Sequence, residues 1–142
     1  MCSSDLANAT VTALFQSAAN VPIDWYDEHG LALGDGETWS DVDTRDPLGK
    51  GMTLSQEYVA MTDPNNPTSF FAIGEVRLGS PTTVDFSPNS TARVYTLQYR
   101  TDLARGGWTN VAGQVAVPGG EPLEDSGTNT QRFYRVLVEV PE

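Results

Sequence analysis

The most informative stretch of this sequence is Asp46-Pro47-Leu48-Gly49-Lys50-Gly51-Met52-Thr53-Leu54-Ser55-Gln56-Glu57. It has the length of a helix-bounded calcium loop, which takes oxygen ligands at positions 1, 3, 5, 7 and 12 and needs glycine at position 6 for a sharp turn. Asp46, Gly51 and Glu57 occupy positions 1, 6 and 12. The stretch therefore predicts a tight turn that leads into a short helix.

The same stretch departs from that pattern at two ligand positions. Position 3 is Leu48 and position 5 is Lys50, so two expected carboxylates are missing and a cation replaces one of them. This substitution suggests a hypothesis of its own. The ammonium of Lys50 takes the place of calcium, pairs with Asp46 and Glu57, and holds the loop closed without metal.

The composition indicates a folded, turn-rich protein. A chain of 142 residues with 13 Gly and 9 Pro holds one ordinary domain, or one small domain with a helical appendage. One cysteine excludes an internal disulfide, and no Cys/His cluster offers a zinc site. No apolar run approaches the roughly 18 residues of a membrane span, so none is predicted.

The net charge of −11 is unevenly distributed. Between Asp24 and Asp63 there are ten acidic residues against only Arg45 and Lys50. Phosphate backbones need clustered Lys and Arg, so nucleic acid is not an expected partner. Two interpretations of the acidic segment stay open, a solvated surface and a region that binds divalent cations.

Residues 1–20 form an N-terminal segment with two ambiguities. Cys2-Ser3-Ser4-Asp5-Leu6 is what a common sequencing-adapter oligonucleotide encodes, so residues 1–6 are either a cloning scar or native. If they are a scar, we expect the reading frame to be cut at its start. Further on, β-branched residues favour a strand over a helix in the segment Thr10, Val11, Thr12, Ala13, Leu14, Phe15 and Gln16.

Residues 21–67 are predicted to form a helical module. Pro22 to Gly30 predicts a short helix with Pro22 in the first helical position, His29 in the last turn and Gly30 as a left-handed cap. Leu54, Tyr58 and Met61 recur at helical spacing, which predicts one buried face of a second helix. The prolines of Thr62–Pro67 end that helix and mark the expected internal boundary.

Residues 68–142 alternate between apolar and polar positions and are rich in turn residues. Short strands at regular spacing predict an antiparallel sandwich or a small barrel. The expected strands are Phe71–Leu78, Thr83–Phe86, Arg93–Tyr99, Trp108–Val111, Gln114–Val117 and Arg132–Val138.

The helical module resembles the thrombospondin type 3 and dockerin-like calcium-loop repeats of large secreted bacterial proteins. The residues that carry this resemblance are Ile23-Asp24-Trp25, His29-Gly30-Leu31 and Asp46–Pro64. It implies calcium as the cofactor, bound by the side chains of Asp46 and Glu57 and by the carbonyl of Met52. Leu48 and Lys50 depart from the pattern of those repeats.

The second half resembles a short fibronectin type III-like β-sandwich of the kind that often ends such proteins. The resemblance rests on Tyr95–Arg100, Trp108–Val111 and Phe133–Val136, and it implies a secreted or cell-surface location. Such a domain places a last strand after Tyr134 to Val140, where this sequence stops. We therefore expect an unpaired sheet edge that accepts another strand, with Thr10–Gln16 as the donor in cis or from a neighbouring copy.

These features predict a non-catalytic structural or interaction module, one form of which is a self-assembling fibre subunit joined by β-strand addition. Its expected partners are further copies or other surface proteins. The alternative is a carbohydrate-binding or adhesion module appended to a larger secreted enzyme, with Trp25, Trp39 and Trp108 either as a glycan platform or as core residues. Catalysis is not predicted, because the single His29 is expected to cap a helix and no carboxylate spacing indicates a glycosidase.

Overall fold

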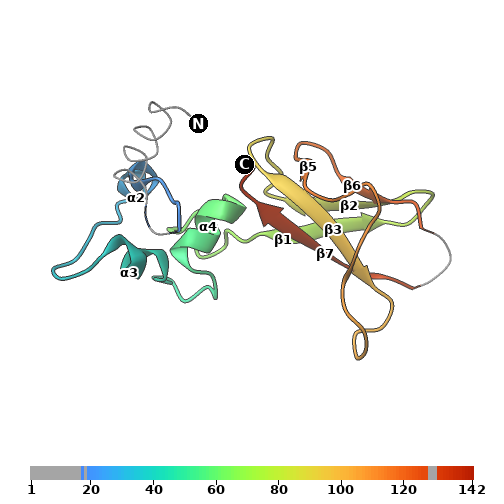
Figure 1. Ribbon diagram of the computed structural model, residues 1–142, viewed down its shortest axis with the longest axis horizontal. Helices are drawn as coiled ribbons and strands as arrows, with labels where there is room; N and C mark the ends of the chain where they lie inside the picture. The colour runs from blue at the N-terminus through green and yellow to red at the C-terminus, as the bar shows by residue number, and fades with distance from the viewer. Residues whose placement is uncertain (1–16, 18, 128–130) are drawn as a thin grey trace, which may run out of the picture. The chain divides into compact units, whose positions relative to one another are not determined.

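The computed structural model describes residues 17, 19–127 and 131–142 (Figure 1). This part of the chain is mainly β, with antiparallel sheets and a few short helices, which confirms the predicted class. The elements follow in the order α2 (Ile23–Glu28), α3 (Trp39–Asp43), α4 (Leu54–Ala60), β1 (Ala72–Arg77), β2 (Thr82–Ser87), β3 (Val94–Arg100), β4 (Thr109–Asn110), β5 (Val117–Pro118), β6 (Leu123–Asp125) and β7 (Phe133–Glu139).

The chain divides into two compact units. The first runs up to Tyr58 and also includes Thr62–Ser69, and the second consists of Val59–Met61 and Phe70–Glu142. The described helices begin in the first unit, and the strands all belong to the second. No helix in the described ranges combines the length and apolar character needed to cross a membrane.

Helix α2 begins and ends close to the predicted positions. Pro22 was predicted as the first helical residue but is the N-cap, so the helix begins one residue later, at Ile23; His29 is the C-cap. Gly30 follows with φ of 71°, the left-handed conformation expected of a residue just after a helix.

Helix α3 was not predicted from the sequence, and a local capping box explains it. Thr38 N–H donates to Asp41 Oδ2 at 2.8 Å, and Asp41 N–H donates to Thr38 Oγ1 at 3.4 Å. The hydrogen bond from the Thr38 backbone is the main reason that the pKa of Asp41 lies below its usual value. The two residues together satisfy amide groups that would otherwise be left unpaired at the helix start.

Helix α4 begins with a similar pair, since Thr53 N–H donates to Gln56 Oε1 at 2.9 Å. Leu54 is fully buried and Tyr58 is partly buried against the same cluster, as the helical spacing predicted. The prediction that Met61 shares this buried face is wrong. Met61 is 41% exposed and has φ of 62°, because the chain leaves the helix there in a left-handed conformation.

The first unit has its own small core. Val21, Tyr26, Val42 and Leu54 are fully buried, and four partly buried side chains pack against them, namely Trp25, Leu31, Trp39 and Tyr58. Tyr26 Oη also donates to Asp43 Oδ1, and Asp43 Oδ2 accepts the Ala19 N–H at 3.0 Å. Burial and then this hydrogen bond raise the pKa of Tyr26. Apart from Val21, the buried residues of this core come from α2, α3 and α4.

The second unit consists of two antiparallel sheets. One has the order β1-β2-β6. In the other, β4 and β5 pair with one side of β3, and β7 pairs along the full length of β3 on the other side. The register of the β3–β7 pair runs from Val94 opposite Glu139 to Arg100 opposite Phe133.

Both sheets contribute to one hydrophobic core, whose buried members are Val84, Phe86, Tyr95, Leu97, Val111 and Leu123. Asp125 on β6 also links the sheets, because it accepts hydrogen bonds from Tyr134 Oη on β7 at 2.7 Å and from Arg132 Nη1 at 2.8 Å. Burial acts to raise the pKa of Asp125, but these bonds and one from the Gly127 N–H outweigh it and lower the pKa.

Two strand assignments differ from the sequence prediction. Of the expected strand Gln114–Val117, only Val117 is in a strand, and it belongs to β5 with Pro118. Ala116 has φ of 51°, which a regular strand does not contain. Strand β6 was not predicted, because it has only three residues and two of them are acidic.

Candidate functional site

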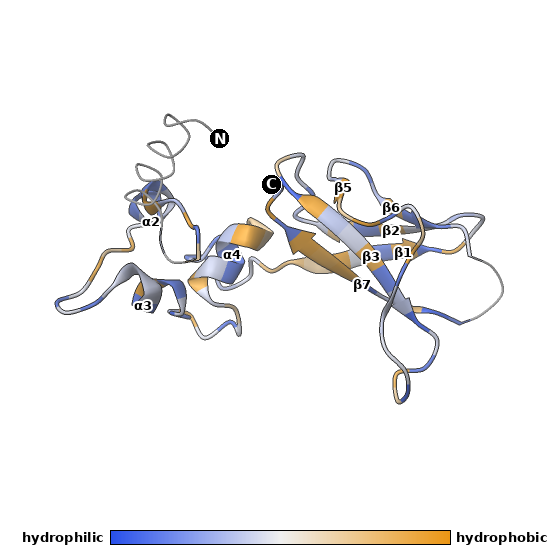
Figure 2. Ribbon diagram, in the orientation of Figure 1, coloured by the Kyte–Doolittle hydropathy of each residue, from blue (hydrophilic) through white to orange (hydrophobic). Residues whose placement is uncertain are grey.

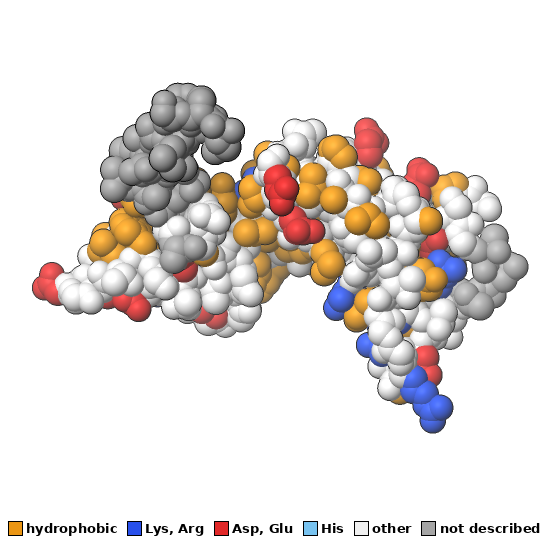
Figure 3. All heavy atoms as spheres, viewed as in Figure 1, with side chains coloured by type: hydrophobic (Ala, Val, Ile, Leu, Met, Phe, Trp, Pro, Cys, Tyr) orange, Lys and Arg blue, Asp and Glu red, His pale blue; other side chains and the backbone are white. Residues whose placement is uncertain are grey.

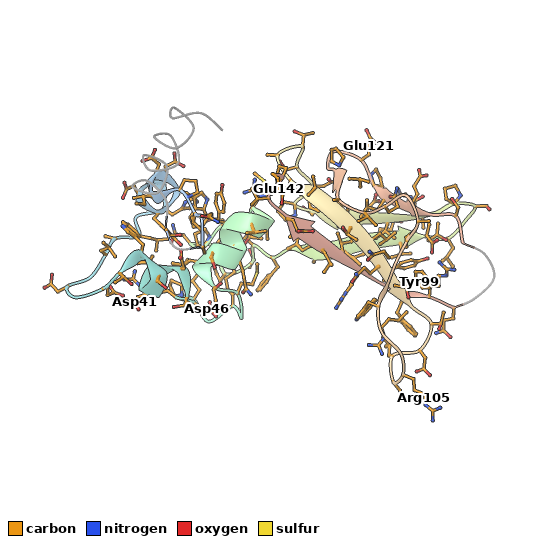
Figure 4. The ribbon with its side chains drawn as sticks, viewed as in Figure 1. Asp41, Asp46, Tyr99, Arg105, Glu121 and Glu142 are labelled. Atoms are coloured by element: carbon orange, nitrogen blue, oxygen red, sulfur yellow. The ribbon has the colours of Figure 1, made fainter. Side chains whose placement is uncertain are left out.

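The loop that follows α3 is held closed by the carboxylate of Asp46 (Figure 4). Asp46 Oδ1 accepts the Lys50 N–H at 2.9 Å, and Asp46 Oδ2 accepts the Gly51 N–H at 2.8 Å. Gly49 and Gly51 have φ of 65° and 84°, conformations that glycine adopts without steric cost. Asp46 therefore fixes the turn through backbone groups.

The side chain of Lys50 lies inside this unit and acts as its buried cation. Lys50 Nζ is 2.5 Å from Glu57 Oε1 and donates to the carbonyls of Asp63 and Asn66, each at 3.0 Å. Only 2% of the Lys50 side chain and 1% of the Glu57 side chain are exposed. The ammonium thus joins the loop, helix α4 and the turn that follows it.

The two carboxylate oxygens of Glu57 differ in their hydrogen bonding. Glu57 Oε1 also accepts the Thr62 hydroxyl at 3.1 Å. Glu57 Oε2 is buried and has no hydrogen-bond partner among the described residues. A buried carboxylate that is only partly satisfied depends strongly on its one charged partner.

The three predicted metal ligands are placed as follows. Asp46 binds backbone N–H groups, Glu57 binds the ammonium of Lys50, and Met52 is a partly buried loop residue between them. Leu48, at the third loop position, is 45% exposed. Across residues 17, 19–127 and 131–142, no three His, Cys, Asp or Glu side chains form a group suited to a metal ion.

The hypothesis about Lys50 needs one adjustment. Lys50 Nζ pairs with Glu57 as the sequence suggested and also donates to the carbonyls of Asp63 and Asn66, whereas the Asp46 carboxylate accepts the backbone N–H of Lys50. Every residue has a backbone carbonyl, so the residue types do not indicate which carbonyls will bind the ammonium. The only available signal was the proline-containing turn of Thr62–Pro67, where a chain reversal brings carbonyls together.

The second candidate site is the edge of β7 that faces away from β3. Leu97 N–H donates to the Gln114 carbonyl and the Leu97 carbonyl accepts the Val111 N–H, so the Leu97 backbone points away from β7. In an antiparallel pair, the residue opposite such a position also points its backbone groups outward. That residue is Val136, and the alternation extends the same direction to Tyr134 and Val138.

This edge, defined by Tyr134, Val136 and Val138, also borders an incompletely covered core. The three side chains pack against the core cluster of the second unit yet are only partly buried. Strand β7 is largely hydrophobic (Figure 2). Hydrophobic atoms are exposed over it (Figure 3), and Leu137 and Val140 are 37% and 43% exposed. Among the described residues, β7 pairs only with β3.

The predicted donor residues Thr10, Val11, Thr12, Ala13, Leu14, Phe15 and Gln16 lie outside the described residues. The three tryptophans are placed differently from one another. Trp25 and Trp39 pack on the core of the first unit, where Trp39 is stacked on Tyr26. Trp108 belongs to the second unit, and the guanidinium carbons of Arg100 and Arg135 lie 5.5 and 4.6 Å from its ring centre.

His29 has a local role at the end of α2. Its Nδ1 is 2.7 Å from the Trp25 carbonyl, and its ring lies 4.4 Å from the Trp25 ring, centre to centre. It thus contacts the last turn of its own helix. A scan against protein-family models, a search of curated proteins and a search of solved structures each found no match for this chain.

Proposed function

We propose that this protein is a non-catalytic structural or interaction module of the cell exterior, which assembles by β-strand addition at the edge formed by Tyr134, Val136 and Val138. The observation that carries the proposal is that this edge has outward N–H and C=O groups and no partner strand among the described residues. Such an edge is a template for pairing with another strand.

As part of this proposal, we interpret the two sheets as a fibronectin type III-like sandwich. In that arrangement β7 takes the place of the penultimate strand, and the last strand of the family would lie beside it. The partial exposure of Tyr134, Val136 and Val138 supports this assignment, because a strand in that position would cover them. Burial of apolar surface would then add to the main-chain hydrogen bonds.

The proposed occupant is the segment Thr10–Gln16 of a neighbouring copy. It has seven residues, as many as β7, and its alternation places Val11, Ala13 and Phe15 on one face. In a strand these three side chains would point towards the core while the backbone pairs with β7. If each copy donates its segment to the next copy, the contacts between copies are head-to-tail. Such contacts generate a filament when the rotation from one copy to the next does not close a ring.

The experiment is a mass measurement on the full chain by light scattering across a concentration series. We compare the unchanged protein with Ala13→Pro, which cannot donate a ladder hydrogen bond, and with Ala13→Val as a control that retains strand propensity. The proposal predicts concentration-dependent oligomers for the unchanged protein and Ala13→Val, and monomers for Ala13→Pro.

A monomer at every concentration for the unchanged protein would overturn assembly between copies, as would identical masses for all three proteins. If the protein is monomeric, the alternative function to test is that of a carbohydrate-binding module. A glycan array on the same sample tests that prediction, with Trp108→Ala as the comparison because Trp108 belongs to the β unit outside its core cluster.

A further inference from the structure

We infer that Lys50 is a built-in substitute for a metal ion, so that the fold of the first unit does not depend on calcium. The calcium that the loop resemblance implies does not fit the residues present. A calcium ion takes six to eight oxygen ligands, mostly carboxylates and carbonyls. Here an ammonium lies 2.5 Å from Glu57 Oε1, one of the two carboxylate oxygens that the twelfth loop position would offer to the metal.

The acceptors around Lys50 Nζ are those that a small cation attracts. They are one carboxylate oxygen and two backbone carbonyls, the latter from Asp63 and Asn66 at 3.0 Å. A lysine ammonium has three N–H donors and no acceptor, so it can donate one hydrogen bond to each of these three oxygens. The near-complete burial of both charged side chains leaves the pair little screened by solvent.

The charges of the loop residues also argue against calcium binding. The third and fifth positions carry Leu48 and Lys50 where a calcium loop has carboxylates, and the side chain of Leu48 is exposed. A calcium ion that approached Glu57 would meet the positive charge of Lys50 and would have to displace it. The structure therefore assigns the cation role to a side chain that is always present, whatever the calcium concentration.

This inference predicts that exchange of one residue creates a metal site. Lys50→Asp removes the ammonium and supplies the missing carboxylate at the fifth position, beside Asp46 and Glu57. Leu48→Asp is the matched control, because it adds a carboxylate to the same loop at an exposed position and keeps Lys50. The double variant Leu48→Asp/Lys50→Asp restores both positions.

The measurement is calorimetric titration with calcium chloride, together with thermal unfolding in 10 mM calcium and in EDTA. We expect no binding and no change in melting temperature for the unchanged protein and for Leu48→Asp. For Lys50→Asp we expect a Kd of about 10⁻⁴ to 10⁻³ M, as in extracellular calcium modules, and tighter binding in the double variant. Calcium at 10 mM would then raise the folding equilibrium constant of Lys50→Asp roughly 10- to 100-fold.

Calcium binding by the unchanged protein, or a lower melting temperature in EDTA, would overturn the inference. Equal binding by Lys50→Asp and Leu48→Asp would also overturn it. If Lys50→Asp is unfolded in EDTA, tryptophan fluorescence shows whether calcium restores its fold, since Trp25 and Trp39 lie in this unit. Lys50→Gln removes the charge without adding a carboxylate, and we expect it to be destabilised and indifferent to calcium.

Discussion

Replacement of Lys50 by methionine should destabilise the first unit severely. Methionine keeps most of the length of the side chain but removes the ammonium, so the fully buried Glu57 retains only the Thr62 hydroxyl at 3.1 Å. Loss of one partner from a buried ion pair costs about 3–5 kcal/mol, because the other charge is left uncompensated. The carbonyls of Asp63 and Asn66 each lose one hydrogen bond as well.

That loss is large for a unit of this size. Folded proteins have about 0.05–0.15 kcal/mol of stability per residue, which gives roughly 3–8 kcal/mol for a unit of about 50 described residues. Lys50→Met should therefore leave the first unit close to unfolded at 25 °C. Urea unfolding followed by tryptophan fluorescence measures this, because Trp25 and Trp39 pack on the affected core.

A double variant separates the ion pair from simple packing. Lys50→Met combined with Glu57→Leu removes both charges, and replacement of a buried pair by apolar residues is often close to neutral. We expect the double variant to recover most of the stability that Lys50→Met loses. A loss below about 1 kcal/mol in Lys50→Met, the range of exposed ion pairs, would refute the reasoning. So would strictly additive losses in the double variant.

Three further predictions concern the β unit and the tyrosines. Tyr134→Phe removes one donor to the buried Asp125 and should cost about 1.5 kcal/mol in the free energy of unfolding by urea, and no change would show that the bond contributes nothing. Burial and the bond to Asp125 raise the pKa of Tyr134 to about 12, and the pKa of Tyr26 is raised as well. Because a raised pKa favours the protonated folded state, stability should be complete below pH 10 and fall as the pH rises towards 12. Phenolate absorbance, compared between the unchanged protein and the Tyr26→Phe and Tyr134→Phe variants, should show both phenols ionising above pH 10, and ionisation of either near pH 10 would contradict this. Gly119→Ala places a methyl group 2.2 Å from the Ser90 carbonyl oxygen and should lower stability by about 3 kcal/mol, whereas Gly74→Ala meets no atom within 4 Å and should have little effect on the same urea curve.

The regular parts of the fold could be predicted because their residues carry a periodic signal. Alternation indicated the strands around Val84, Leu97 and Val136, and helical spacing with a terminal glycine indicated the helix before Gly30. Strand β6 carries no such signal, since Glu124 and Asp125 are poor strand formers and the strand is formed by its pairing with β2. Helix α3 depended on a capping interaction between Thr38 and Asp41 that occupies only four residues.

The candidate sites were also predictable only in part. The charges of Lys50 and Glu57 and their places in the loop pointed to a pairing between them, because a cation at a metal-ligand position is conspicuous. Lys50 also donates to the carbonyls of Asp63 and Asn66, whose positions depend on how the chain turns after α4. The open edge was expected from the family resemblance, but the outward direction of the Val136 backbone required the register between β3 and β7.

The most direct test of the proposed function is amide hydrogen exchange along β7, measured by NMR at a concentration where the protein assembles. Strand addition predicts slow exchange at Tyr134, Val136 and Val138 in the unchanged protein and fast exchange at the same amides in Ala13→Pro. Arg135 and Leu137, whose amides face β3, serve as internal controls and should be slow in both. Fast exchange at Tyr134, Val136 and Val138 in the unchanged protein, with Arg135 and Leu137 protected, would contradict the account.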